Sequence, residues 1–223
     1  MMDAPTEVPS RERRLLRPSA NRGMAVLAIL VSALLALWTG AFAIWLIRDR
    51  LHIACEMGQP GSEGAGTWTC SDGIGYLGAA VALGAIWLFT VLLGSIVAGT
   101  VRNTTTAPVM LVLLALLATA CVLGLTWHGS SEMVHDDYSP MRGTGYWAEA
   151  VGAAAVVSAI SLMVAVVSLA FSGRAARVLC GVGAAGLVLA TILQPGLGIN
   201  LVPAAGLLAA AGIRAPTPSK TAP

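Results

Sequence analysis

Five long apolar stretches, separated by short polar segments, constrain this chain more than any other feature. They cover residues 23–47, 75–101, 108–127, 146–171 and 178–213. A helix needs about 20 residues to cross about 30 Å of hydrocarbon, which each of these stretches provides. With 57% hydrophobic and only 11% charged residues, the chain also has too little polar surface for a soluble globule. The sequence therefore predicts an all-α integral membrane protein.

The last apolar stretch is too long for a single crossing. As one helix, residues 178–213 would measure about 54 Å at 1.5 Å per residue. Pro195-Gly196 interrupts it, and this pair is a strong turn signal because proline removes a backbone donor. We expect two short helices, 178–193 and 201–213, joined near the outer surface. The predicted fold is thus a helical bundle of about five to six transmembrane segments, the last a Pro/Gly-interrupted short hairpin.

The interruption has two interpretations. Unwound backbone within a membrane can form an ion or substrate site, and Gln194 and Asn200 would then line a pathway. Alternatively, the interruption is a hairpin turn whose free carbonyls are hydrated. A transporter with inverted repeats should show a matching break elsewhere, and none of the other four stretches has an internal proline. The sequence therefore favours the turn.

Charge distribution predicts the orientation and the domain organisation. Lys and Arg near span ends remain cytoplasmic, and five arginines precede the first stretch. With that tail inside, only Arg48, Arg50 and Arg142 of the 13 basic residues lie outside. The expected parts are a disordered cytoplasmic tail (1–22), a bundle over 23–213 with spans 23–47, 75–101, 108–127, 146–171, 178–193 and 201–213, outer loops 48–74 and 128–145, and a cytoplasmic tail (214–223).

A cleaved export signal is the main alternative for the first stretch. The Arg13-Arg14 pair and the small residues Ala41 and Ala43 resemble such a signal and its cleavage site. However, the apolar run continues to Ile47, beyond the roughly 7–15 residues of a signal's apolar region. We expect an uncleaved first helix.

The outer loops hold the candidate sites. Cys55 and Cys70 lie on the side expected to be oxidising, so we predict a disulfide that holds a surface around Trp68, a possible partner contact. In the second loop, four residues could offer nitrogen and oxygen ligands to a divalent metal. Their spacing matches no strong metal signature, and a hydrated acidic loop is the favoured interpretation. These weak candidates are His128, Glu132, His135 and Asp136.

Functional classes are limited chiefly by what the sequence lacks. No ionisable residue falls at the predicted mid-membrane depth, which disfavours proton relays and coupled transporters. We find no catalytic or nucleotide-binding motif and no basic stripe typical of nucleic-acid binding, and we expect no cofactor. The sequence favours a non-enzymatic accessory or scaffold subunit of a larger bacterial membrane complex, with the lipid bilayer and other membrane subunits as partners. The alternative is a transport or channel component that uses the broken C-terminal segment.

Overall fold

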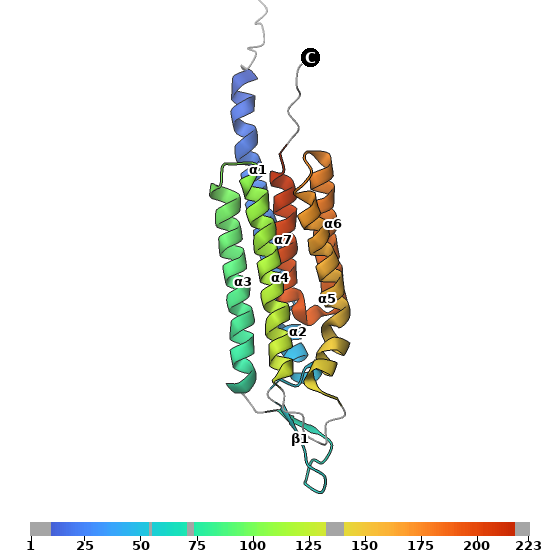
Figure 1. Cartoon of the computed structure of the whole chain (residues 1–223). Coiled ribbons are helices and arrows are strands. Elements are labelled where there is room, and N and C mark those ends of the chain that lie inside the picture. Colours follow the sequence, from blue (N-terminus) through green and yellow to red (C-terminus); the bar gives the residue numbers. More distant parts are fainter. Residues whose placement is uncertain (1–9, 54, 71–73, 133–140, 217–223) are drawn as a thin grey trace, which may run out of the picture.

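The computed structural model describes residues 10–53, 55–70, 74–132 and 141–216. Six of its helical segments are long and apolar enough to cross a membrane, so the chain is a multi-pass membrane protein built as an all-α bundle (Figure 1). The elements in chain order are α1 (Ser10–Leu37), α2 (Gly40–Trp45), the π-helix η1 (Leu46–Arg50), β1 (Cys55–Met57), β2 (Trp68–Cys70), α3 (Ile74–Thr100), α4 (Thr106–Ser131), α5 (Gly143–Ser168), α6 (Arg174–Leu193), the 3-10 helix η2 (Pro195–Leu197) and α7 (Gly198–Arg214).

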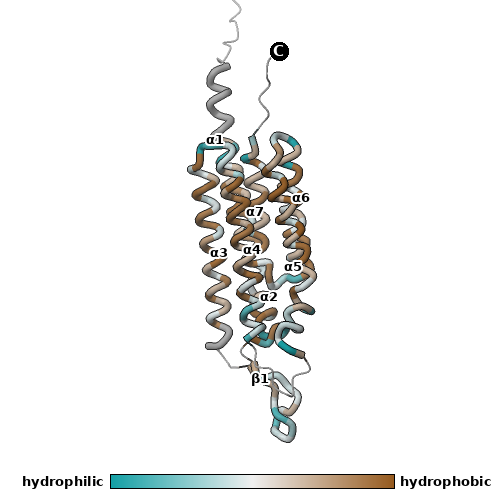
Figure 2. The backbone as a smooth tube through the Cα atoms, viewed as in Figure 1, coloured by the Kyte–Doolittle hydropathy of each residue, from teal (hydrophilic) through white to brown (hydrophobic). Residues whose placement is uncertain are grey.

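The two ends of the bundle differ in character. Figure 1 places the start of α1, the α3–α4 connection and the end of α7 at one end, which we call the arginine end. The β1–β2 hairpin projects from the other, which we call the hairpin end. Hydrophobic residues follow the helices between them, and hydrophilic residues gather at the ends and on the hairpin (Figure 2). Apolar helices separated by polar connections are therefore arranged as a bilayer requires.

The first helix starts within the segment that was expected to be a disordered tail (1–22), because α1 begins at Ser10. Residues 1–9 of that segment lie outside the described residues. The segment 10–17 is rich in Arg, Leu and Glu, which are good helix formers. Adding residues to a helix that already exists costs little compared with starting a new one. The membrane helix therefore extends into its basic flank.

The first apolar stretch is not one helix. The prediction of a single span over 23–47 is wrong, because α1 ends at Leu37 and α2 starts at Gly40 in a new direction. At the break, the Thr39 hydroxyl donates a hydrogen bond to the carbonyl of Ala36 (2.6 Å). The segment after the break, α2 and η1, lies below the start of α7 in Figure 1. Only the last part of the predicted first span, residues 40–47, thus folds beneath the C-terminal helix.

The C-terminal helix α7 fills the centre of the bundle. In an apolar stretch of 18 residues within Pro195–Arg214, 78% of the residues are buried. The corresponding stretches of the other five spans have 22% to 39% of their residues buried. It packs on α1, α3, α4 and α6. Small residues permit this close approach: a Cβ on Gly206 would lie 2.0 Å from Oγ of Ser32 in α1. The bundle therefore has a protein-enclosed helix at its axis.

The α6–α7 turn also differs from expectation. Its position near the outer surface was predicted, but Gln194, Gly196 and Leu197 are buried. The reason is that α2 and the start of η1 cover the turn: a Cβ on Gly196 would lie 2.4 Å from Cβ of Leu46 in η1 and 2.8 Å from the carbonyl oxygen of Phe42 in α2. The two helices are also longer than expected, since α7 starts at Gly198 rather than at residue 201.

Candidate functional site

The β1–β2 hairpin projects from one end of the bundle. Strands β1 and β2 are antiparallel, with Cys55 opposite Cys70 and Met57 opposite Trp68. The predicted disulfide between Cys55 and Cys70 is present. An isolated two-stranded hairpin is only marginally stable in water, so the covalent link and the contacts at its base decide its shape.

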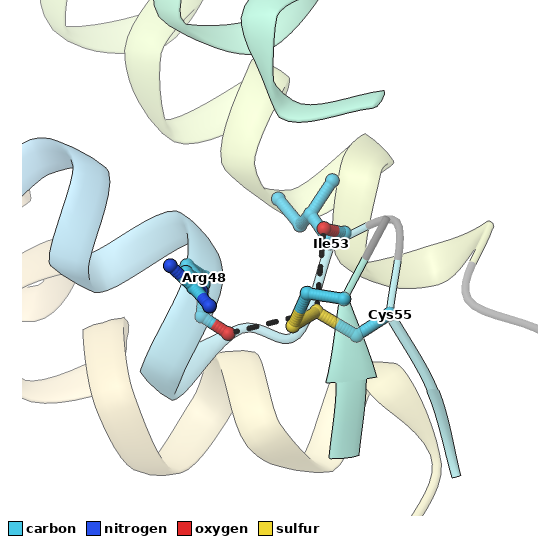
Figure 3. Close-up of a disulfide and its surroundings, with 4 residues drawn as sticks. Arg48, Ile53 and Cys55 are labelled. Carbon is cyan, nitrogen blue, oxygen red and sulfur yellow. Dashed lines mark hydrogen bonds between the residues drawn. A yellow bond between two sulfur atoms is a disulfide. The ribbon is translucent and has the colours of Figure 1, made fainter. Parts of the chain in front are cut away.

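The base of the hairpin rests on the end of η1 (Figure 3). Sγ of Cys55 lies 3.8 Å from the carbonyl oxygen of Arg48 and 3.7 Å from that of Ile53. A disulfide sulfur carries no hydrogen, so these are packing contacts. The backbone continues the attachment, because the N–H of Ile53 donates to the carbonyl of Ile47 (3.0 Å). The disulfide is thereby fixed to the bundle and not only to the opposite strand.

Three aromatic rings attach the hairpin to α5. The rings of His52 and Trp68 stack at 4.2 Å between centroids with an interplanar angle of 8°. Tyr146 meets both edge-on, at 5.2 Å from His52 and 6.0 Å from Trp68. Burial lowers the pKa of His52, although the charge of Asp49 opposes this shift. The lowered pKa favours a neutral imidazole at neutral pH, which suits a stacked ring.

The sequence did not indicate His52 or Tyr146 as parts of this cluster. His52 has a φ of 47°, uncommon for a residue other than glycine, and this backbone conformation accompanies the turn from η1 into β1. No sequence spacing connects three residues on separate elements. Trp68, predicted as a partner contact, is half-buried with one face against His52. The partner contact itself remains a prediction, and the ring also anchors the hairpin.

The tip of the hairpin is ordered by its own backbone and is exposed. The N–H of Gly58 donates to the carbonyl of Thr67 (3.0 Å), and the N–H of Gly66 donates to the carbonyl of Gly58 (3.2 Å). Pro60 and Glu63 are exposed. The tip is thus a preformed polar surface held away from the bundle.

The second loop gives little support to a metal site. Nε2 of His128 lies 3.4 Å from Oε1 of Glu132, and both side chains are well exposed at the end of α4. His135 and Asp136 lie outside the described residues. Among the residues that the structure describes, no group of three or more His, Cys, Asp or Glu side chains could hold a metal ion.

The two predicted pathway residues behave differently in the buried turn. Gln194 is satisfied, since its Nε2 donates to the carbonyl of Ala150 (2.7 Å) and its Oε1 accepts from the N–H of Gly196 (3.3 Å). Asn200 is 1% exposed, and neither Nδ2 nor Oδ1 has a hydrogen-bond partner among the described residues. The Gln194 side chain therefore holds the turn together, whereas the Asn200 amide has no evident structural role.

This difference predicts opposite effects of apolar substitutions. We expect Asn200→Val to raise the free energy of unfolding by about 1 kcal/mol, because a buried amide without partners is costly. Gln194→Met should lower the free energy of unfolding by about 1–2 kcal/mol, since two hydrogen bonds are lost. Thermal unfolding of both variants in the same detergent measures these effects. Strong destabilisation by Asn200→Val would mean that the amide holds a water, ion or substrate.

Comparisons of the chain with models of known families, with curated proteins and with solved structures find no match.

Proposed function

We propose that this chain is a non-enzymatic accessory or scaffold subunit of a larger bacterial membrane complex, and that the hairpin of residues 55–70 contacts the partner. The observation that carries the proposal is the hairpin itself, which is fixed at its base by the disulfide and the His52 and Tyr146 rings while its tip stays exposed. A surface ordered before binding loses less conformational entropy when a partner binds.

The filled centre of the bundle also supports this proposal. A transport pathway needs a cavity or a polar channel between helices, and here α7 occupies the axis. In the described part of the chain, the ionisable residue buried on α7 is Arg214, which sits at its last position. This observation supports a bundle that acts through contacts at its periphery.

Removing the disulfide tests the proposal. We expect the Cys55→Ser and Cys70→Ser double variant to insert with unchanged helix content, because each membrane helix satisfies its own backbone hydrogen bonds. Partner affinity should fall about tenfold or more, since the hairpin must then be ordered on binding. The readout is the size of the native assembly after mild detergent extraction, with Cys121→Ser as control because Cys121 is a free, exposed cysteine on α4. A wild-type chain that runs alone, or a double variant that keeps its partner, contradicts the proposal.

The orientation belongs to the same proposal, because the hairpin must face the oxidising side. With the N-terminus cytoplasmic in the cell membrane, reporters that work only in the cytoplasm should be active after Asn103, after Arg174 and at the C-terminus. The same reporter placed within the hairpin should be silent. A cytoplasmic signal from the hairpin would reverse the topology and remove the basis for a disulfide there.

The alternative function is a transport or channel component. The Asn200 amide, which has no hydrogen-bond partner among the described residues, is the observation that favours it, because a buried polar group without a protein partner can mark the place of a bound water or ligand. If Asn200→Val is stabilising, as expected above, this support for the alternative is removed.

A further inference from the structure

Four arginines from different parts of the chain converge at the arginine end. They line one hollow of about 170 Å³, together with Asn21 and Thr104. This volume is several times the roughly 30 Å³ that a water molecule occupies in the liquid. The four are Arg22 of α1, Arg102 of the α3–α4 connection, Arg177 of α6 and Arg214 of α7.

The hollow has no counter-charge among the described residues. No aspartate or glutamate side chain that the structure describes lines it, and the ion pair found in the described part of the chain, between His128 and Glu132, lies at the end of α4. Arg214 is only 5% exposed, so at least one of these charges is largely withdrawn from water. The positive-inside rule accounts for arginines on one side of the membrane, but not for their convergence on one concave site. A bound anion would offset their repulsion.

An apolar groove begins beside this hollow. It has a volume of about 530 Å³ and lies between α1 and α6, with α7 at its floor. Met24 and Ile213 line the groove, and each is within two residues of an arginine that lines the hollow. Along α1 the groove extends from Met24 to Leu35, which is roughly 16 Å of helix. That length is about half of the roughly 30 Å hydrocarbon core, or one leaflet.

We propose that the arginine end binds an anionic phospholipid, in which the phosphate headgroup carries a net negative charge. The headgroup lies in the hollow, where guanidinium groups match phosphate oxygens and Asn21 and Thr104 add hydrogen-bond donors. One acyl chain lies in the groove against Val31, Ala185 and Val188. A soluble phosphate compound would leave the groove unused, and a partner transmembrane helix would need a groove that spans both leaflets.

The test uses the purified, delipidated full-length chain in detergent. Phosphatidylglycerol and phosphatidylcholine are added separately, and retained lipid is counted by native mass spectrometry. Sodium phosphate and glycerol 3-phosphate form the water-soluble arms. Two matched pairs of variants separate the two halves of the site. Arg177→Gln is compared with Arg174→Gln, an exposed arginine on the same helix that does not line the hollow. Ala185→Phe is compared with Ala153→Phe, an exposed position on α5 away from the groove.

We expect the wild type to retain phosphatidylglycerol in preference to phosphatidylcholine. Arg177→Gln should weaken retention about fivefold, the effect of one arginine near an anionic lipid, and Arg174→Gln should not. Ala185→Phe should also weaken retention, while Ala153→Phe leaves it unchanged. Equal losses with Arg174→Gln and Arg177→Gln would replace the proposed site with a diffuse positive surface. Tight binding of glycerol 3-phosphate that is insensitive to Ala185→Phe would identify a soluble phosphate ligand and overturn the lipid assignment.

Discussion

Replacing Gly196 with alanine is expected to lower the free energy of unfolding by about 2–3 kcal/mol, the upper part of the range for overpacking a closely packed site. The added Cβ would lie 2.4 Å from Cβ of Leu46 and 2.8 Å from the carbonyl oxygen of Phe42. Neither atom is the end of a flexible side chain, so α2 must move away from the turn. That movement would open the cover over the α6–α7 connection.

Gly181→Ala is the matched control for this prediction. Gly181 is exposed on α6, and nothing lies within 4 Å of the position its Cβ would take. Alanine is the better helix former, so this variant should be as stable as the wild type or slightly more stable. Thermal unfolding in detergent measures both variants. An unchanged midpoint for Gly196→Ala would show that α2 does not pack on the turn as described.

Arg214→Met is the second substitution with a large expected effect, a loss of about 2–4 kcal/mol in the free energy of unfolding. Nη1 of Arg214 donates to the carbonyl of Ala98 (3.0 Å), and Nη2 donates to the carbonyl of Val101. These two carbonyls lie at the C-terminal end of α3, where helix carbonyls lack intrahelical partners and a cation is favourable. Removing the guanidinium leaves both without their charged donor.

The loss of repulsion acts in the opposite direction, because Arg22 lines the same hollow. This gain should be smaller, since salt and water screen charges at the end of the bundle more than they weaken buried hydrogen bonds. Arg214→Lys should recover only part of the stability because lysine cannot present two donors in a planar fork. Arg174→Met, at an exposed position, is the control. Equal unfolding midpoints for Arg214→Met and Arg174→Met would refute the capping role.

The membrane helices were predictable because hydropathy reports them directly. The span expected over 75–101 is α3 (Ile74–Thr100), and the one expected over 146–171 is α5 (Gly143–Ser168). The break after Leu37 was not predictable, since Trp38-Thr39-Gly40 interrupts an apolar run without a proline or a charge. Nor does hydropathy distinguish a helix that faces lipid from one that faces protein. The central position of α7 could therefore be recognised only from the structure.

The candidate sites also include features that the sequence predicted and features that it could not predict. The Cys55–Cys70 link followed from two cysteines in one loop expected on the oxidising side, which is a local property of the sequence. The contacts of Trp68 with His52 and Tyr146 depend on how the loop meets α5, which no local pattern reports. In the sequence, the arginines of the hollow indicated only the side of the membrane on which each connection lies. Their convergence depends on the positions of helix ends in three dimensions.

The enclosed position of α7 has a consequence for how the protein is made. A helix that leaves the translocon normally enters the lipid bilayer, but α7 is mostly surrounded by other helices of the bundle. It also emerges after α1, α3, α4 and α6, so these helices must leave its site open until then. If the earlier helices closed on one another first, they would bury the faces that α7 needs. Biogenesis of this bundle therefore includes an insertion into protein rather than into membrane, because α7 enters a site formed by helices that were made before it.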